Sequence, residues 1–368
     1  MQQKIFKGDN LKYYAASIAL SGVSLYFKSR LFEFFDNDIQ AFWECKKLEL
    51  EEFAHCNPDV SIPKTFLSKK EKINPDFEYE NAIEKGYKIL TYDDENYPEL
   101  LKQIPDYPLA MYYKGSFEGI NLSRTLAIVG SRKASENAKE SLAKIISQMQ
   151  NTDVTIVSGL AYGIDATAHA CAIKNNLKTI GVIGSGLDFE YPSSNKNLYK
   201  QIEEGSGVVL SEFSPSVPPM AQNFPQRNRI VTGMSFGTLV AEAALKSGAM
   251  ISANLTLEQA RELMCMPGLI SNPNCEGIYH LIKNGASIVT CANDIYECLN
   301  WTLEQNDKKI KLEGVEKNVF DTIQIEPLSF DSLCSKLNIP STELMVCLTG
   351  MELKGLIKQI NAKYYIAN

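Results

Sequence analysis

The residues best suited to chemistry in this sequence are arginines that lie beside aromatic side chains and glycine turns. The segment NFPQRNRIVTG places Arg227 and Arg229 on either side of Asn228, close to a phenylalanine and a proline. Guanidinium groups bind phosphates through paired hydrogen bonds and aromatic rings stack on bases, so this pattern fits a polyanion better than a metal. An alternative for one arginine is a structural ion pair, with Glu212 or Glu242, that braces a sheet.

A second candidate is the turn Gly130-Ser131-Arg132-Lys133, which joins the strand-like run TLAIVG to a helix that begins near Ala134 or Ser135. The N–H groups and the dipole at the start of a helix favour an anion. Arg132 can add a paired hydrogen bond to the same phosphate. The alternative is an ordinary turn glycine followed by a solvated arginine.

Other strand-like runs also stop at glycine, at Ser158-Gly159, Gly184-Ser185-Gly186 and Pro267-Gly268. In an open parallel sheet the ligand lies beyond the carboxyl ends of the strands, so we expect these turns to converge on one crevice. The alternative is that tight turns between strands and helices use glycine whatever they bind.

These turns require an α/β framework, which the middle of the chain predicts. Seven short apolar runs alternate with helical segments from Thr125 onward: TLAIVG, VTIVSG, KTIGVIG, GVVLSE, GTLVAEA, ELMCMPG and ASIVT. Such alternation is typical of a doubly wound parallel sheet. Before it, residues 11–70 have helical spacing and form a predicted helical domain, and residues 72–108 predict one lead-in strand, around ILTY, within a loop.

The C-terminal segment predicts a winged helix-turn-helix. Helices at VFDTIQI, SFDSLCSKLN and TELMVCLTGMELKGLI precede the strand-like QINAKYYIA. In the last helix, Leu344, Cys347, Leu348 and Met351 have the spacing of a packed face. The same helix carries Glu343, so we expect it to serve packing or protein contacts and not to read bases.

Composition limits the class of protein. The 368 residues predict two or three domains, and 45% hydrophobic residues without a long apolar run predict a folded chain that does not span a membrane. The N-terminus lacks a signal-peptide pattern, which predicts a cytoplasmic protein. A net charge of -7 means that any DNA site must be a local basic patch. Nine cysteines without zinc spacing predict no metal site.

Several motifs together resemble the DNA-processing A (DprA/Smf) family. They are VGSRKAS, SGLAYGIDATAHACAI, TIGVIGSGLDFEYPSSN, the long run from LSEFSPSVPPMAQNFPQRNR to ELMCMPG, and NGASIVT, in that order. The resemblance implies an N-terminal helical domain similar to sterile-alpha-motif (SAM) folds, an extended Rossmann-like domain that binds single-stranded DNA and dimerises, and a C-terminal winged-helix-like domain. It also implies that the protein protects incoming DNA during natural transformation and loads the RecA recombinase onto it.

With these implications, we expect a SAM-like helical domain over residues 1–75, a Rossmann-like DNA-binding domain over 76–300, a linker over 301–316 and a winged-helix-like domain over 317–368. The expected partners are single-stranded DNA, RecA and a second copy of the chain, with no cofactor and no enzymatic activity. The alternative is a nucleotide-processing enzyme similar to phosphoribohydrolases and lysine-decarboxylase-like proteins, since FGTLVAE resembles their GTxxE motif with the spacing off by one.

The resemblance also assigns residues. The family's G-S/T-R arginine matches Arg132, and its F-P-x-R-N-R arginines match Arg227 and Arg229. Tyr162 and Phe236 stand where the family often has a basic residue. We expect that one of these rings replaces the lost charge by stacking on a base. Ser193 also replaces a common basic residue, with Lys196 the next nearest cation.

Asp165 and His169 lie four residues apart on one predicted helix and have the spacing of an acid/base pair. The resemblance places both in a GIDxxAH motif, where we expect a structural hydrogen bond. We therefore expect no catalytic and no metal-binding residues. The expected DNA-binding residues are Gly130, Ser131, Arg132, Lys133, Ser158, Gly159, Gly184, Ser185, Gly186, Ser193, Lys196, Phe224, Arg227, Asn228, Arg229 and Lys246.

Overall fold

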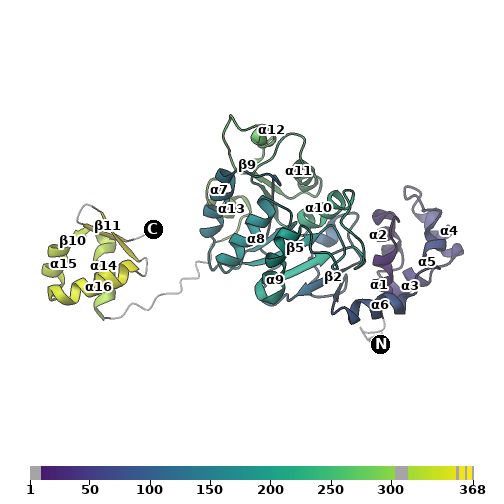
Figure 1. Cartoon of the computed structure of the whole chain (residues 1–368), viewed down its shortest axis with the longest axis horizontal. Helices are drawn as coiled ribbons and strands as arrows, with labels where there is room; N and C mark the ends of the chain where they lie inside the picture. Colours follow the sequence, from purple (N-terminus) through teal and green to yellow (C-terminus); the bar gives the residue numbers. More distant parts are fainter. Residues whose placement is uncertain (1–9, 303–313, 354–355, 361–362, 367–368) are drawn as a thin grey trace. The chain divides into compact units, whose positions relative to one another are not determined.

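The computed structural model describes residues 10–302, 314–353, 356–360 and 363–366. The chain divides into two compact units, Met1–Leu303 and Glu304–Asn368 (Figure 1). Most of the expected linker, residues 303–313, lies outside the described residues, and helix α14 already begins at Gly314, within the range expected for the linker.

In the described part of the first unit, nine strands form one sheet in the order β1-β2-β6-β5-β4-β3-β7-β8-β9. The strands from β6 to β9 in this order are parallel, whereas β1 and β2 are antiparallel additions at one edge. The bounds are β1 (Lys88–Thr91), β2 (Ala110–Gly115), β3 (Thr125–Val129), β4 (Thr155–Ser158), β5 (Lys178–Ile183), β6 (Gly207–Ser211), β7 (Gly237–Val240), β8 (Glu262–Cys265) and β9 (Ser287–Ile288). The predicted doubly wound parallel sheet is thus confirmed.

Helices cover both faces of the sheet because its central strands are apolar on both sides. Along β3, Leu126 and Ile128 belong to one buried cluster and Ala127 and Val129 to the other. The first cluster includes α7 (Glu136–Ser147), α8 (Ile164–Lys174) and α13 (Ala292–Cys298); the second includes α10 (Asn223–Gly233), α11 (Gly248–Glu258) and α12 (Glu276–Lys283). Shorter helical turns are η1 (Leu101–Gln103), η2 (Ser193–Asn195), α9 (Lys196–Gln201), η3 (Ile202–Ser206) and η4 (Pro273–Cys275).

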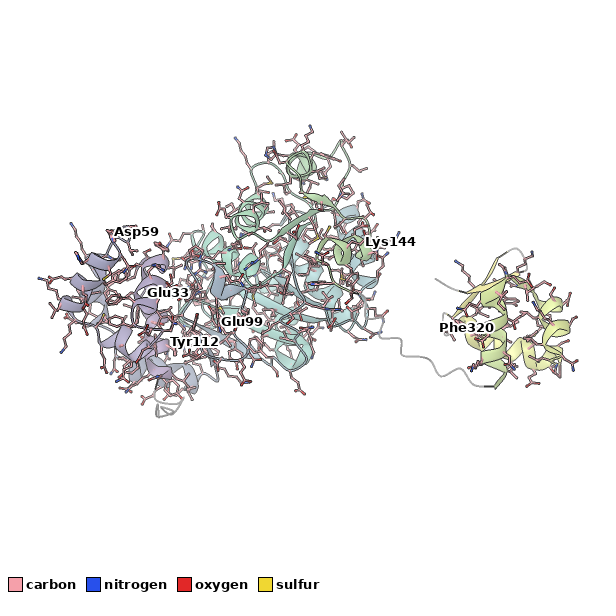
Figure 2. The ribbon with its side chains drawn as sticks, turned by 180° about the vertical axis from the view of Figure 1, so that it is seen from behind. Glu33, Asp59, Glu99, Tyr112, Lys144 and Phe320 are labelled. Carbon is pink, nitrogen blue, oxygen red and sulfur yellow. The ribbon has the colours of Figure 1, made fainter. Side chains whose placement is uncertain are left out.

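The N-terminal helices belong to the same compact unit as the sheet. They are α1 (Leu11–Ala19), α2 (Leu25–Phe34), α3 (Ile39–Glu44), α4 (Lys47–Cys56), α5 (Phe66–Lys70) and α6 (Pro75–Glu84). Their core contains Phe27, whose ring makes edge contacts with Phe53 and Phe66, and it is continuous with one face of the sheet. Figure 2 labels Glu33, on α2, which accepts a hydrogen bond from the Tyr107 hydroxyl at 3.3 Å across this junction.

Two elements that precede β3 were not predicted. Helix α6 begins after Asn74, whose side chain accepts the Asp76 N–H at 3.0 Å, and Pro75 occupies its first turn, where a proline costs no hydrogen bond. Strand β2 pairs antiparallel with both β1 and β6, so it joins the lead-in hairpin to the parallel sheet. The strand predicted at ILTY corresponds to β1.

The order of the strands creates a switch point at the centre of the sheet. The chain leaves β3 to form β4, β5 and β6 on one side, and later returns to form β7, β8 and β9 on the other. The connections after β3 and β7 therefore diverge and leave a crevice at the carboxyl ends of these two strands.

The second unit contains α14 (Gly314–Ile325), β10 (Leu328–Ser329), α15 (Phe330–Leu337), α16 (Ser341–Leu353), β11 (Ile357–Ile360) and β12 (Lys363–Ile366), with strand order β10-β12-β11. Helix α15, a turn, helix α16 and the β11–β12 hairpin follow one another as in a winged helix. Leu344, Cys347, Leu348 and Met351 are buried, as the spacing predicted. Among the described residues of the chain, no helix is both long and apolar enough to cross a membrane.

A buried lysine lies where the N-terminal helices meet the sheet. The Lys28 Nζ donates to the carbonyl oxygens of Ser17 at 3.1 Å and Leu20 at 3.4 Å. Burial lowers the pKa of Lys28 to about 8, and the nearby Glu212 carboxylate opposes the shift only in part. Lys28 therefore loses its proton in the folded chain at a lower pH than in the unfolded chain.

We predict that Lys28→Met changes how stability depends on pH. Between the two pKa values the unfolded chain binds the extra proton, so this lysine makes the free energy of unfolding rise with pH. From pH 7.5 to pH 10 the wild-type chain should gain about 2 kcal/mol relative to Lys28→Met, measured by urea unfolding. Lys47→Met, which removes an exposed lysine, is the matched control; parallel profiles for wild type and Lys28→Met would contradict the assignment.

Candidate functional site

A crevice of about 730 Å³ lies at the switch point, beyond the carboxyl ends of β3 and β7. The loop after β3 forms one wall through residues 129–133, and the start of α11 forms another through residues 247–249. The first turns of α10 contribute Phe224, Arg227 and Asn228. The other turns predicted to converge here do not line this crevice: Gly159, Gly184 and Ser185 line a smaller space beside it, and Pro267 and Gly268 line neither.

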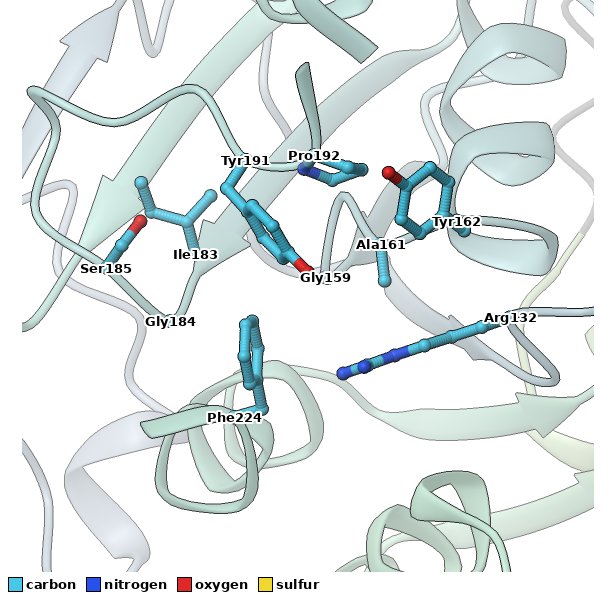
Figure 3. Close-up of a pocket in the computed structure, with 10 residues that line it drawn as sticks. All are labelled: Arg132, Gly159, Ala161, Tyr162, Ile183, Gly184, Ser185, Tyr191, Pro192 and Phe224. Atoms are coloured by element: carbon cyan, nitrogen blue, oxygen red, sulfur yellow. The ribbon is translucent and has the colours of Figure 1, made fainter. Parts of the chain in front are cut away.

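A smaller pocket adjoins this crevice and is drawn in Figure 3. Arg132, Ala161, Tyr191 and Phe224 line both spaces. The remaining residues of the smaller pocket are Gly159, Tyr162, Ile183, Gly184, Ser185 and Pro192. The residues that the two spaces share thus include one cation and two aromatic rings.

Arg132 is the cation at this shared wall. Its side chain is exposed, and its guanidinium carbon lies 4.9 Å from the centre of the Phe224 ring, toward which it points in Figure 3. Within the described part of the chain, no carboxylate lies within ion-pair distance of Arg132 or of its neighbour Lys133. Both positive charges are therefore available to an anionic ligand.

Arg227 lies on the floor of the crevice and is almost fully buried. Its Nη1 donates to the carbonyl oxygen of Gly159 at 2.6 Å and to that of Val182, so one guanidinium ties the end of β4 to β5. A side chain at Gly159 would collide with this guanidinium and with the Asp165 carboxylate, which explains the glycine. The Arg227 Nε also donates to the Asn228 side-chain oxygen at 3.2 Å.

Asp165 supports the same arrangement. Its carboxylate accepts the Ala161 N–H at 3.4 Å and lies next to Arg227. Burial raises the pKa of the Asp165 carboxyl and lowers the pKa of the Arg227 guanidinium, while the attraction between the two groups opposes both shifts. Asp165 thus fixes the loop before α8, which agrees with the structural hydrogen bond expected for it.

His169 is not part of either pocket lining. Its Nδ1 lies 2.7 Å from the Thr179 hydroxyl on β5. Burial and the positive charge of Arg227 lower the pKa of His169 to about 3, so the ring is neutral near pH 7. Asp165 and His169 therefore have separate structural contacts.

Arg229 points away from the crevice and forms the brace considered as the alternative. It makes an ion pair with Glu212 through Nη2, and its Nε lies 3.1 Å from the Asp106 carboxylate. Both Arg229 and Glu212 are buried. Arg229 lines neither pocket.

The start of α7 differs from the sequence expectation of a vacant anion site. The Glu242 carboxylate accepts the Ser135 hydroxyl at 2.5 Å and the Ser135 N–H at 3.2 Å, and it also accepts the Asn272 side chain at 3.1 Å. An internal carboxylate therefore occupies the position where we expected a phosphate. The loop cations Arg132 and Lys133 remain open to a ligand.

The other predicted site residues divide by position. Gly130 and Ser131 line the crevice, and Gly184 and Ser185 line the smaller pocket. The following residues line neither space: Ser158, Gly186, Ser193, Lys196 and Lys246. The Ser158 hydroxyl donates to the Ile128 carbonyl at 2.6 Å, and Lys196 lies 3.8 Å from the Glu190 carboxylate.

The two aromatic residues expected as candidates for base stacking, Tyr162 and Phe236, lie in different places. Tyr162 lines the smaller pocket. Phe236 precedes β7, at the opposite edge of the sheet from the crevice, and its ring packs against Trp301 with a 6.1 Å separation of the ring centres. The alternative that Phe236 stacks on a base at this site was therefore wrong. Phe236 lies at the amino end of β7, whereas the crevice lies at the carboxyl ends of the strands. Sequence reasoning did not select Tyr191, although it flanks a proline at the end of a glycine-rich loop.

The described residues contain no cluster of three or more side chains suited to a metal ion. The aromatic, cationic and glycine-rich lining instead fits a ligand with both phosphate and ring surfaces.

Comparison with known proteins adds independent findings. A family model described as DNA recombination-mediator protein A matches residues 88–300, and one described as DprA winged helix domain matches residues 304–362. The chain is 36% identical over 293 residues to Protein Smf of Escherichia coli strain K12, covering 76% of this chain and 77% of that protein.

Two solved structures are also similar. The X-ray structure of DNA processing protein A from Streptococcus pneumoniae superposes with a TM-score of 0.68 at 34% identity, over 78% of this chain and 97% of that one. A Helicobacter pylori DNA processing protein A, described as having a unique single-stranded DNA binding mode, gives a TM-score of 0.52 at 28% identity, over 58% of this chain and 95% of that one.

We predict that Arg229→Met and Arg132→Met affect stability very differently. Removing Arg229 leaves the Glu212 carboxylate buried without its partner, which should lower the free energy of unfolding by about 3 kcal/mol. Arg132→Met should change it by less than about 0.5 kcal/mol, since its side chain is exposed. Urea unfolding of both variants measures the difference, and Glu212→Gln added to Arg229→Met should restore part of the loss. Equal effects of the two single substitutions would contradict the division of roles.

Proposed function

The chain belongs to the DNA recombination-mediator protein A (DprA/Smf) family, and we propose that it binds single-stranded DNA in the crevice beyond β3 and β7. The observation that carries this proposal is the position of Arg132, exposed and over the Phe224 ring, where the crevice meets the smaller pocket. A guanidinium beside aromatic rings provides contacts for a phosphate and for the face of a base.

The preference for a single strand follows from the aromatic lining. The faces of bases are stacked inside a duplex, whereas an unpaired strand can place them on protein rings. Such stacking and phosphate contacts are tolerant of sequence, so we expect little sequence specificity. The net charge of -7 makes the contribution of each local cation important.

We assign two kinds of role to the predicted site residues. The proposed direct contacts are Gly130, Ser131, Arg132, Lys133, Gly159, Gly184, Ser185, Phe224, Arg227 and Asn228. The proposed supporting residues, which hold the loops and helices around the crevice, are Ser158, Gly186 and Arg229. Ser193, Lys196 and Lys246 are proposed to contact the strand outside the crevice.

We also propose that the chain acts by binding and not as an enzyme. In support, the buried Asp165 carboxylate lies beside Arg227 and accepts the Ala161 N–H, and Glu242 of the GTLVAE segment accepts hydrogen bonds from Ser135 and Asn272. These contacts give both carboxylates a structural role in holding the loops around the crevice. Release of a base from nucleoside monophosphates by the purified chain would favour the nucleotide-processing alternative.

The family description as a recombination mediator supports a further role. We propose that the chain loads RecA onto the bound strand, protects incoming DNA in natural transformation and acts in the cytoplasm as a homodimer.

The adjacent Leu269 and Ile270, 60% and 90% exposed, provide an apolar surface for a second copy. Light scattering of wild type and Ile270→Glu tests the dimer, and RecA filament assembly on coated DNA tests the loading.

The second unit has a different proposed role. Its helix α16 exposes Glu343, Met345 and Val346, and the described residues of this helix, Ser341–Leu353, include no lysine or arginine. An apolar and acidic surface suits a protein contact better than a phosphate backbone. We therefore assign DNA binding to the first unit and propose that a chain ending near Glu313 keeps most of the affinity for a single strand.

We predict that Arg132→Ala weakens binding of a 20-nucleotide oligo-dT about tenfold and leaves the folding of the chain intact. Loss of one phosphate contact should also reduce the slope of log affinity against log salt by about 0.7. Fluorescence anisotropy over a salt series measures both quantities. Lys144→Ala, which removes an exposed cation from the last turn of α7 (labelled in Figure 2), is the control. Unchanged affinity in folded Arg132→Ala, or tighter binding to duplex DNA, would count against the proposal.

A further inference from the structure

We propose that Tyr162 and Tyr191 form a nucleobase subsite next to Arg132, in which one base stacks on Tyr162 while an adjoining phosphate contacts the guanidinium. This inference rests on the proposed binding of single-stranded DNA and assigns a specific contact within it.

The first observation is the exposure of two large rings at one pocket. Tyr162 is 45% exposed and Tyr191 is 42% exposed, and both line the smaller pocket. In Figure 3 the two rings lie on either side of Pro192, with Arg132 across the pocket from them. Ring faces that remain open in a pocket are well suited to stack on a planar ligand.

The second observation is that Tyr191 and Phe224 already have ring contacts. The Tyr191 and Phe224 ring centres are 5.9 Å apart, and Arg132 lies over Phe224. The Tyr199 hydroxyl donates to the Tyr191 carbonyl at 2.8 Å and fixes its backbone. Among the described residues, by contrast, Tyr162 has no ring–ring or cation–π contact, so its face is the one available to a base.

The third observation is that the backbone holds Tyr162 at a fixed place relative to Arg132. Gly163, directly after Tyr162, has φ +74°, and a side chain there would collide with the carbonyl oxygen of Ser131. The Ile164 N–H donates to that same oxygen at 3.2 Å. The loop that carries Tyr162 is thus bonded to the loop that carries Arg132, so the backbone holds these two residues on neighbouring loops at one pocket.

The charge of the pocket identifies the class of ligand. Arg132 is the one cation in the described lining of the smaller pocket, and that lining has no carboxylate. A neutral aromatic ring attached to an anion satisfies both parts of such a site, and a nucleotide within a strand has this composition. Stacking accepts any base, because every base has a π face.

The test compares two oligomers that differ only in their bases. A labelled 20-nucleotide oligo-dT and an abasic 20-mer with the same phosphates are titrated into the full-length chain and followed by fluorescence anisotropy. The variants are Tyr162→Ala, Tyr162→Phe and the matched control Tyr26→Ala, which removes an exposed tyrosine of α2. Tyr162→Phe keeps the ring and removes only the hydroxyl.

We expect Tyr162→Ala to weaken oligo-dT binding about tenfold and abasic binding less than about twofold, because stacking requires the base. Tyr162→Phe and Tyr26→Ala should match the wild type with both oligomers. An equal loss for both oligomers with Tyr162→Ala, or no loss for oligo-dT, would overturn the subsite and leave the proposed function standing. If the wild-type chain binds neither oligomer, the proposed function fails and the subsite fails with it.

Discussion

The candidate site depends on one buried guanidinium. Arg227, from α10, donates to the carbonyl oxygens of Gly159 and Val182 and lies beside the Asp165 carboxylate. These contacts join the ends of two parallel strands to the start of two helices, where backbone groups would otherwise lack partners. The loops that carry the aromatic and glycine residues of both pockets are consequently fixed relative to one another.

The cations around the site have different roles. Arg229, two residues further along α10, forms ion pairs with Glu212 and Asp106, so its charge stabilises the junction of α10 with the rest of the first unit. Arg132 and Lys133 have no ion-pair partner in the described residues and face the crevice. An acidic chain can therefore present a local positive site, because Arg229 is ion-paired within the fold while the exposed loop cations Arg132 and Lys133 remain open to a ligand.

The sequence predicted the parallel strands because apolar β-branched runs that alternate with helical segments allow few other arrangements. It did not predict strand β2, whose partner β6 lies far along the chain, and the Asn74-Pro75 helix start was read as a turn. Arg227 and Arg229 look equivalent in the sequence. Only their contacts in the fold show that Arg229 is a brace paired with Glu212, and that Arg227 bonds to Gly159 at the floor of the crevice. The hydrogen bonds from Ser135, the residue that caps α7, to Glu242 likewise depend on a contact between distant residues.

Hydrogen exchange of the full-length chain with and without a 20-nucleotide oligo-dT tests whether single-stranded DNA binds in the crevice of the first unit. Backbone amides of bound loops exchange more slowly because binding suppresses local opening. We expect slower exchange over residues 130–135, 159–164, 184–192 and 222–228, with no change over 314–353. Protection confined to 314–353, or saturated DNA binding without slower exchange in the four crevice segments, would contradict this expectation.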